Sequence, residues 1–320
     1  MSDRQAHPSF RRRLRAVPWR KVVAGVFTVA LFGYLGVTLA ANWQELLTYD
    51  WQINVVYLLA SVAVYVLSLL VGATAWHRIV WSMDQRVPYR QGVKFFLQSN
   101  VAKRLPGLIW YALGRIYLYE REEVTKSTVT MALTLELVSV IVGGVFVFLL
   151  TIWGSASILA KLDLARLPAS WQWWTLLPVV GLLVVVFWPQ SLYRAANWIL
   201  VRRGHAPLRG RVRPADLVQW SLFQVGGWLT GGLFLYLLAA GVYPDLGWSH
   251  LVETINSWTG AGLVAYLTLI VPLGLGLKEV TLAYLLSALM PFPVAVLISL
   301  LGRICSIIGD CVGLLVASRL

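Results

Sequence analysis

Eight long apolar stretches dominate the sequence and constrain its fold more than any other feature. They cover residues 22–41, 53–76, 95–119, 125–152, 173–189, 215–241, 255–290 and 293–317. A helix needs about 20 apolar residues to cross the hydrocarbon core, whereas a strand of a membrane β-barrel needs only about 9–11. Only 13% of the residues are charged, against about 25% in soluble domains. The pattern predicts an all-α polytopic membrane protein and excludes a soluble enzyme, a disordered chain and a coiled coil.

Two of the eight stretches contain residues that a lipid-facing helix does not tolerate. In stretch 95–119 these residues include Arg104, Pro106, Gly107 and Arg115, and in stretch 255–290 they are Pro272, Gly274, Gly276, Lys278 and Glu279. Broken backbone survives at membrane depth only where protein buries it or water reaches it. Both stretches are therefore predicted to form re-entrant helical hairpins, and the other six to form full transmembrane helices.

Basic residues are distributed unevenly among the segments that connect the apolar stretches. Residues 1–21 contain seven Arg and Lys, residues 77–94 four and residues 190–214 six, while residues 42–52 and 242–257 contain none. Cytoplasmic segments carry the excess of Lys and Arg. The asymmetry therefore predicts a plasma (inner) membrane protein with a basic cytoplasmic N-terminus (1–21), and six spans return the C-terminus to the cytoplasm. Stretch 22–41 is predicted to be a retained signal anchor.

The order of the stretches occurs twice along the chain. Span, span, hairpin and span occupy about residues 22–152 and again about 173–317, within a single membrane domain over residues 22–317. Three spans is an odd number, so the second half must insert upside down relative to the first. Such inverted repeats with broken helices are typical of transporters. The alternative is a chance placement of Pro and Gly, which are frequent in membrane helices.

Three charged residues lie within predicted spans, where a charge at the bilayer centre costs about 2.5–3.5 kcal/mol. Glu136 and Arg303 are each mid-span, and Asp310 follows Arg303 by seven residues on the same helix face. They are interpreted either as a structural ion-pair network or as groups with a substrate or coupling role. If the two repeats pack face to face, Glu136 and Arg303 are expected to approach each other or to share a cavity.

The residues beside the two breaks suggest anion binding. Free helix N-termini and basic side chains hold anions, and lipid phosphate is the most available anion at this depth. The predicted substrate-binding residues are Arg104, Pro106, Gly107, Arg115, Pro272, Gly274, Gly276, Lys278 and Glu279. The alternative for the basic side chains, above all Arg104, is snorkelling to the interface. The sequence contains no Cys/His cluster, so no metal, cofactor or catalytic residue is predicted.

These motifs resemble one family. A Pro-Gly pair, Arg115 and a Glu136-bearing span, followed later by P-x-G-x-G-x-x-E (272–279) and a span with Arg303, are similar to the transmembrane region of lysylphosphatidylglycerol synthases, the flippase domain of the multiple peptide resistance factor. The resemblance covers about residues 22–317 and implies lipid movement between leaflets around two re-entrant hairpins. The chain departs from the family's acidic-basic pair, which reads Glu136-Leu137 here, so the substrate stays open. The soluble synthase domain has no counterpart, and lipid aminoacylation is not expected.

Together these features predict a lipid translocase for an anionic phospholipid, glycolipid or polyprenyl-linked lipid. The alternative is a non-transporting scaffold for an enzyme of cell-envelope lipid or polysaccharide synthesis. An intramembrane enzyme is disfavoured because no paired-carboxylate or His-rich loop stands out, so no enzymatic activity is expected. The expected partners are membrane lipids with anionic head groups, and either further copies of the chain or an envelope-biosynthesis protein. The basic segment 202–213 is assigned to topology and lipid attraction and not to nucleic acid.

Overall fold

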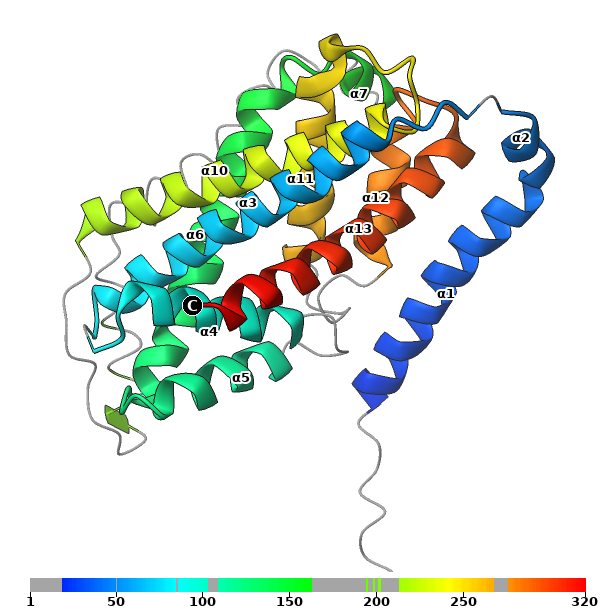
Figure 1. Ribbon diagram of the computed structural model, residues 1–320. Helices are drawn as coiled ribbons and strands as arrows, with labels where there is room; N and C mark the ends of the chain where they lie inside the picture. Colours follow the sequence, from blue (N-terminus) through cyan, green and yellow to red (C-terminus); the bar gives the residue numbers. More distant parts are fainter. Residues whose placement is uncertain are drawn as a thin grey trace, which may run out of the picture.

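The computed structural model describes residues 19–49, 51–84, 86–102, 109–162, 194, 198, 201–202, 213–267 and 276–320. Within these ranges every regular element is a helix and there is no strand (Figure 1). The all-α prediction is therefore confirmed for the described part of the chain.

Four helices of 27 residues each form the long elements of the fold. They are α3 (Val55–Trp81), α6 (Lys126–Ile152), α10 (Pro214–Ala240) and α13 (Phe292–Ser318). At 1.5 Å per residue each is about 40 Å long, which exceeds the roughly 30 Å of a bilayer's hydrocarbon core. By length and composition, all four are able to cross a membrane. They coincide with four of the six predicted spans.

The other two predicted spans have different outcomes. The 23-residue helix α1 (Trp19–Ala41) covers the predicted first span. Its apolar part, Val29–Ala41, is shorter than the four long helices. The predicted span over residues 173–189 lies outside the described residues. The structure thus supports a multi-pass helical protein without establishing the count of six.

The helix ends are set by local sequence signals. The side chain of Asn54 caps α3 by accepting hydrogen bonds from the backbone N–H groups of Val56 and Tyr57. Thr125 caps α6 in the same way through the N–H of Thr128. These side chains satisfy N–H groups that the first helical turn leaves without an intrahelical partner. Pro214 begins α10, where its fixed φ and missing N–H are compatible with the first helical position.

Two pairs of short helices occupy the two stretches predicted to be broken. Helices α4 (Tyr89–Val101) and α5 (Ile109–Glu120) flank residues 103–108, and α11 (Leu251–Leu267) and α12 (Leu277–Leu286) flank residues 268–275. The two members of each pair contact each other. With 12 and 10 residues, α5 and α12 are about 15–18 Å long, too short to cross the hydrocarbon core. The connecting residues of both pairs lie outside the described residues.

Close backbone contacts hold the long helices together. Figure 1 shows α10 alongside α3, and α10 also packs against α6 and α11. At Gly143 of α6, an added Cβ would lie 3.1 Å from both the carbonyl oxygen of Ser221 and the backbone nitrogen of Val225 on α10. At Gly232 of α10, it would lie 2.7 Å from the Cα of Ile255 on α11. Small residues permit the two backbones to approach closely. The resulting van der Waals packing drives helix association in a membrane, where the hydrophobic effect does not act between helices.

The smaller elements lie at the ends of the long helices. The short helix α2 (Trp43–Thr48) follows α1, and α7 (Ala156–Lys161) follows α6. A 3₁₀ turn, η5 (Trp248–His250), precedes α11. The helix α1 contacts α12 and α13, and it lies at the edge of the view in Figure 1.

Replacing Gly232 by Ala is expected to destabilise the protein by about 1–3 kcal/mol, because the new methyl group overlaps Ile255 and the helices must separate. Gly226→Ala, on the same helix, is the matched control, since its Cβ would make an ordinary 3.5 Å contact with Val71. Thermal unfolding of the purified proteins in detergent measures both. Equal melting temperatures for the two variants would contradict the close packing of α10 on α11.

The predicted orientation can be tested at two exposed positions. Glu123, between α5 and α6, has a side chain 89% exposed, and Ser249 is exposed before α11. In a background without Cys305 and Cys311, an impermeant maleimide is expected to label Ser249→Cys in intact cells, and to label Glu123→Cys only after the membrane is opened. Labelling of Glu123→Cys in intact cells would contradict the predicted orientation of the protein in the membrane.

Candidate functional site

A buried ion pair joins the second short helix of the first pair to the long helix that follows it. The Nη1 of Arg115 on α5 donates to Oε2 of Glu136 on α6 at 2.6 Å. Its Nε donates to the hydroxyl of Ser99 on α4 at 3.0 Å. The Arg115 side chain is 0% exposed and that of Glu136 8% exposed. The two charges therefore compensate each other in a region where an unpaired charge is costly.

Aromatic rings enclose the Arg115 guanidinium. Its Cζ lies 4.0 Å from the ring centroid of Trp76, 4.5 Å from that of Phe96 and 5.0 Å from that of Tyr111. The negative faces of such rings attract a cation. Trp76 is itself held in place, because its indole N–H donates to the hydroxyl of Tyr119 at 2.9 Å. Arg115 is thus held by Glu136, Ser99 and three rings, while its buried Nη2 has no hydrogen-bond partner among the described residues.

A second ion pair occurs at the corresponding place in the second half of the chain. The Nη1 of Arg303 on α13 donates to Oε1 of Glu279 on α12 at 2.6 Å. The other carboxylate oxygen of Glu279 accepts the backbone N–H of Gly276 at 2.9 Å, which closes the first turn of α12. Again a residue of the second short helix pairs with the middle of the next long helix, but the signs of the two charges are exchanged.

Gly276, at the start of α12, needs to be glycine for two reasons. Its φ is +82°, in the left-handed region that other residues rarely adopt. An added Cβ would also lie 2.7 Å from the Cβ of Leu31 on α1. The start of α12 at Gly276 therefore lies directly against α1.

The two ion pairs differ in their access to the surroundings. The Arg303 side chain is 22% exposed, compared with complete burial of Arg115. Its guanidinium carbon lies 5.3 Å from the ring centroid of Phe32 on α1. The partly open pair thus lies where α1, α12 and α13 meet.

Asp310 belongs to a separate polar contact. Its Oδ1 accepts from the hydroxyl of Tyr65 on α3 at 3.2 Å and from Nδ2 of Asn100 on α4 at 3.0 Å. Asp310 therefore joins α13 to α3 and α4.

Lys278 on α12 packs its ammonium group against an aromatic ring of the neighbouring short helix α11. Its Nζ lies 3.4 Å from the ring centroid of Trp258 on α11. A cation–π contact of this kind stabilises an ammonium group by about 0.5–2 kcal/mol, depending on its desolvation. Lys278 is thus placed beside the break, although it is oriented by α11.

The structure changes the expected pairing of the charges. Glu136 and Arg303 were expected to approach each other, yet each is bonded to a different partner, Arg115 and Glu279 respectively. The reason is that each half of the chain compensates its own mid-span charge from its own short helix. Five further residues predicted for the site, Arg104, Pro106, Gly107, Pro272 and Gly274, lie outside the described residues.

Several residues of these contacts were not singled out from the sequence. They are Tyr65, Trp76, Ser99 and Asn100. Asn100 was the one with a usable signal, because an amide within an apolar stretch needs a hydrogen-bond partner. The aromatic residues carried no such signal, since interfacial anchoring also accounts for them.

A polar contact at the other end of the second short-helix pair was missed as well. The carboxylate of buried Glu253 on α11 accepts from the backbone N–H of Ser157 at 3.0 Å and contacts Nδ1 of His250 at 2.6 Å. Asn256, one turn later, donates to the carbonyl oxygen of Phe148 and the hydroxyl of Thr151. These bonds fasten α11 to the end of α6 and to α7.

Long apolar helices, short helices around Pro-Gly segments and compensated charges between them define a polytopic helical membrane protein. The sequence model of the family described as lysylphosphatidylglycerol synthase TM region matches residues 21–312. The chain belongs to this family, as its motifs predicted. A comparison with curated proteins found no match.

Removing the carboxylate charge of either pair is expected to lower stability to different extents. Glu136→Gln leaves the fully enclosed Arg115 without a counter-charge, which costs roughly 3–5 kcal/mol. Glu279→Gln is expected to cost less, because the Arg303 side chain is not fully enclosed and is able to turn toward another partner. Thermal unfolding of the two purified variants in the same detergent gives the comparison. A larger loss of stability in Glu279→Gln than in Glu136→Gln would show that the exposure of the arginine does not determine the cost of removing its partner.

Proposed function

We propose that this protein is a lipid translocase that moves a lipid with an anionic head group between the leaflets of the plasma membrane. The lipid is a phospholipid, a glycolipid or a polyprenyl-linked lipid. Membership of a family named for a lipid synthase supports a lipid-related role. The proposal contains no covalent step, cofactor or metal, and both termini are cytoplasmic in it.

The architectural part of the proposal is an inverted repeat with two re-entrant hairpins. Helices α3, α4, α5 and α6 have the same order of lengths as α10, α11, α12 and α13. Each set also contains one ion pair between its second short helix and its second long helix. In this arrangement the two Pro-Gly segments enter from opposite sides, as in transporters that alternate access around a central site.

The observation that carries the functional proposal is the partial exposure of Arg303. A guanidinium presents five N–H donors, and Nη1 is the nitrogen bonded to Glu279. Phosphate and carboxylate are both bound by this donor geometry. A lipid phosphate that reaches the junction of α1, α12 and α13 therefore competes with Glu279 for the same cation.

The neighbouring residues suit this exchange. Glu279 is able to lose Arg303 and still accept the N–H of Gly276. Lys278 adds a second positive charge on α12, although its ammonium is held by Trp258. The head group binds at the break while its acyl chains stay in the bilayer. Enclosed by rings and Glu136, Arg115 has a structural role in this mechanism and not the lipid-binding role expected from the sequence.

Transport by the purified chain tests the proposal. In proteoliposomes that contain a fluorescent phosphatidylglycerol, a quencher added outside reports how fast the lipid changes leaflet. The parent protein is expected to accelerate this exchange. Arg303→Gln is expected to slow it by about tenfold or more, because one lost charge-assisted contact of about 1.5–3 kcal/mol gives a factor of this order. Lys278→Ala is expected to have a smaller effect.

Two controls separate binding from folding. Arg319→Gln removes an exposed arginine at the end of α13 and is expected to transport like the parent. Arg303→Lys retains the charge without the forked donors and is expected to be intermediate. If Arg303→Gln is folded and transports at the parental rate, the site assignment is wrong. If the parent moves no lipid, the scaffold function replaces the proposal.

A further inference from the structure

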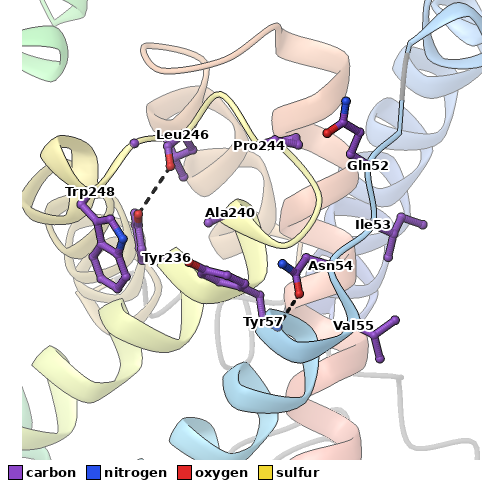
Figure 2. Close-up of a pocket in the computed structure, with 11 residues that line it drawn as sticks. Gln52, Ile53, Asn54, Val55, Tyr57, Tyr236, Ala240, Pro244, Leu246 and Trp248 are labelled. Carbon is purple, nitrogen blue, oxygen red and sulfur yellow. Dashed lines mark hydrogen bonds between the residues drawn. The ribbon is translucent and has the colours of Figure 1, made fainter.

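A hollow of about 640 Å³ lies at one end of α3 and α10, away from both ion pairs. Two chain segments line it, residues 52–57 at the start of α3 and residues 236–248 from the end of α10 to η5. Figure 2 shows Gln52 and Asn54 on one side of it and Tyr236 and Trp248 on the other. Its volume falls within the range of about 300–1,000 Å³ that is usual for small-molecule sites.

The walls of this hollow are held in place by hydrogen bonds. The backbone N–H of Asn54 donates to the carbonyl oxygen of Gly241 at 2.9 Å, which ties the two segments together. The hydroxyl of buried Tyr236 donates to the carbonyl oxygen of Leu246 at 3.4 Å. The ring of Trp248 packs on that of Tyr236 with centroids 4.8 Å apart. The hollow is thus formed before any ligand arrives.

The lining is polar but uncharged. Among the described residues that line the hollow there is no Asp, Glu, Lys, Arg or His, while the amides of Gln52 and Asn54 and the hydroxyls of Tyr57 and Tyr236 contribute to it. The neighbouring segments 42–52 and 242–257 contain no Lys or Arg. The adjacent charged residue Asp245 is exposed and does not line the hollow. An anionic group finds no compensating charge here.

Trp248, at the rim of the hollow, adds an apolar aromatic surface to the polar lining. Trp248 lines the hollow, is 60% exposed, and packs its ring on that of Tyr236. A flat aromatic ring packs well against an apolar face of a ligand, while amides and phenols bond to its polar edge. A sugar ring has this combination, with C–H groups on its face and hydroxyls around its rim.

We infer that the hollow binds an uncharged sugar, either as the head group of a glycolipid or as a free saccharide. Trp248 stacks on the face of the ring, and the side-chain N–H groups of Asn54 and the hydroxyl of Tyr57 bond to its hydroxyls. This site shares no residue with the Arg303 site, so it stands or falls independently of the proposed translocase.

Saturation-transfer NMR on the full chain in phosphatidylcholine nanodiscs tests the inference, with every sugar-based detergent removed beforehand. The probe is methyl β-glucopyranoside, and maltose is a second, larger probe. Both are expected to give transfer to their ring protons. Tetramethylammonium and inorganic phosphate are the charged probes. Binding of a charged probe alone, or of no probe, overturns the inference.

Variants assign the signal to the hollow. Trp248→Ala is expected to weaken sugar binding by roughly five- to tenfold, which corresponds to a loss of about 1–1.4 kcal/mol of binding free energy. Trp153→Ala is the matched control, since Trp153 at the end of α6 is 58% exposed and does not line the hollow. Tyr57→Phe, which removes one hydroxyl, is expected to weaken binding about twofold to fivefold. Equal binding by Trp248→Ala and Trp153→Ala overturns the assignment.

A second arm distinguishes the two sources of sugar. The nanodiscs are prepared with and without a monoglucosyl diacylglycerol. A loss of free-sugar binding in the glycolipid discs supports a lipid-borne sugar as occupant, and unchanged binding supports a free saccharide. If the glycolipid still reduces free-sugar binding to Trp248→Ala, the glycolipid binds elsewhere, which contradicts its binding in the hollow.

Discussion

The cost of a charge in hydrocarbon is the constraint on which the rest of this structure depends. Each half of the chain carries one charge in the middle of a long helix, Glu136 or Arg303, and each is compensated from the short helix just before it. An ion pair requires a fixed distance between its two groups, so the compensation also determines where α5 and α12 lie. The placement of both short helices follows from this pairing.

The two pairs solve the same electrostatic problem with different consequences. Arg115 is surrounded by three aromatic rings and has no exposed surface, so its pairing stabilises one arrangement. Arg303 meets one ring, that of Phe32, and stays partly exposed beside a glycine with positive φ. A pair that is partly open is able to exchange its partner for another anion. The enclosed pair therefore suits a structural role and the open pair a binding role.

The two proposed binding places differ in their polar chemistry. The Arg303 site offers cations beside a broken helix, and the hollow at the end of α3 offers amides, phenols and an indole without charge. Close glycine contacts, such as that of Gly232 on α10 with Ile255 on α11, hold the helices together.

The helical class, four spans, the two broken stretches and the family were all predictable from the sequence. Apolar length, Pro-Gly breaks and caps such as Asn54 are local properties that a bilayer converts directly into helix bounds. The residues Glu136 and Arg303 were also recognisable as functional or structural charges, because hydrocarbon leaves few reasons for them. Only the tertiary structure decided their partners, the ring enclosure of Arg115 and the uncharged hollow. These depend on how each helix is rotated and crossed against its neighbours, which is set by many contacts between distant residues.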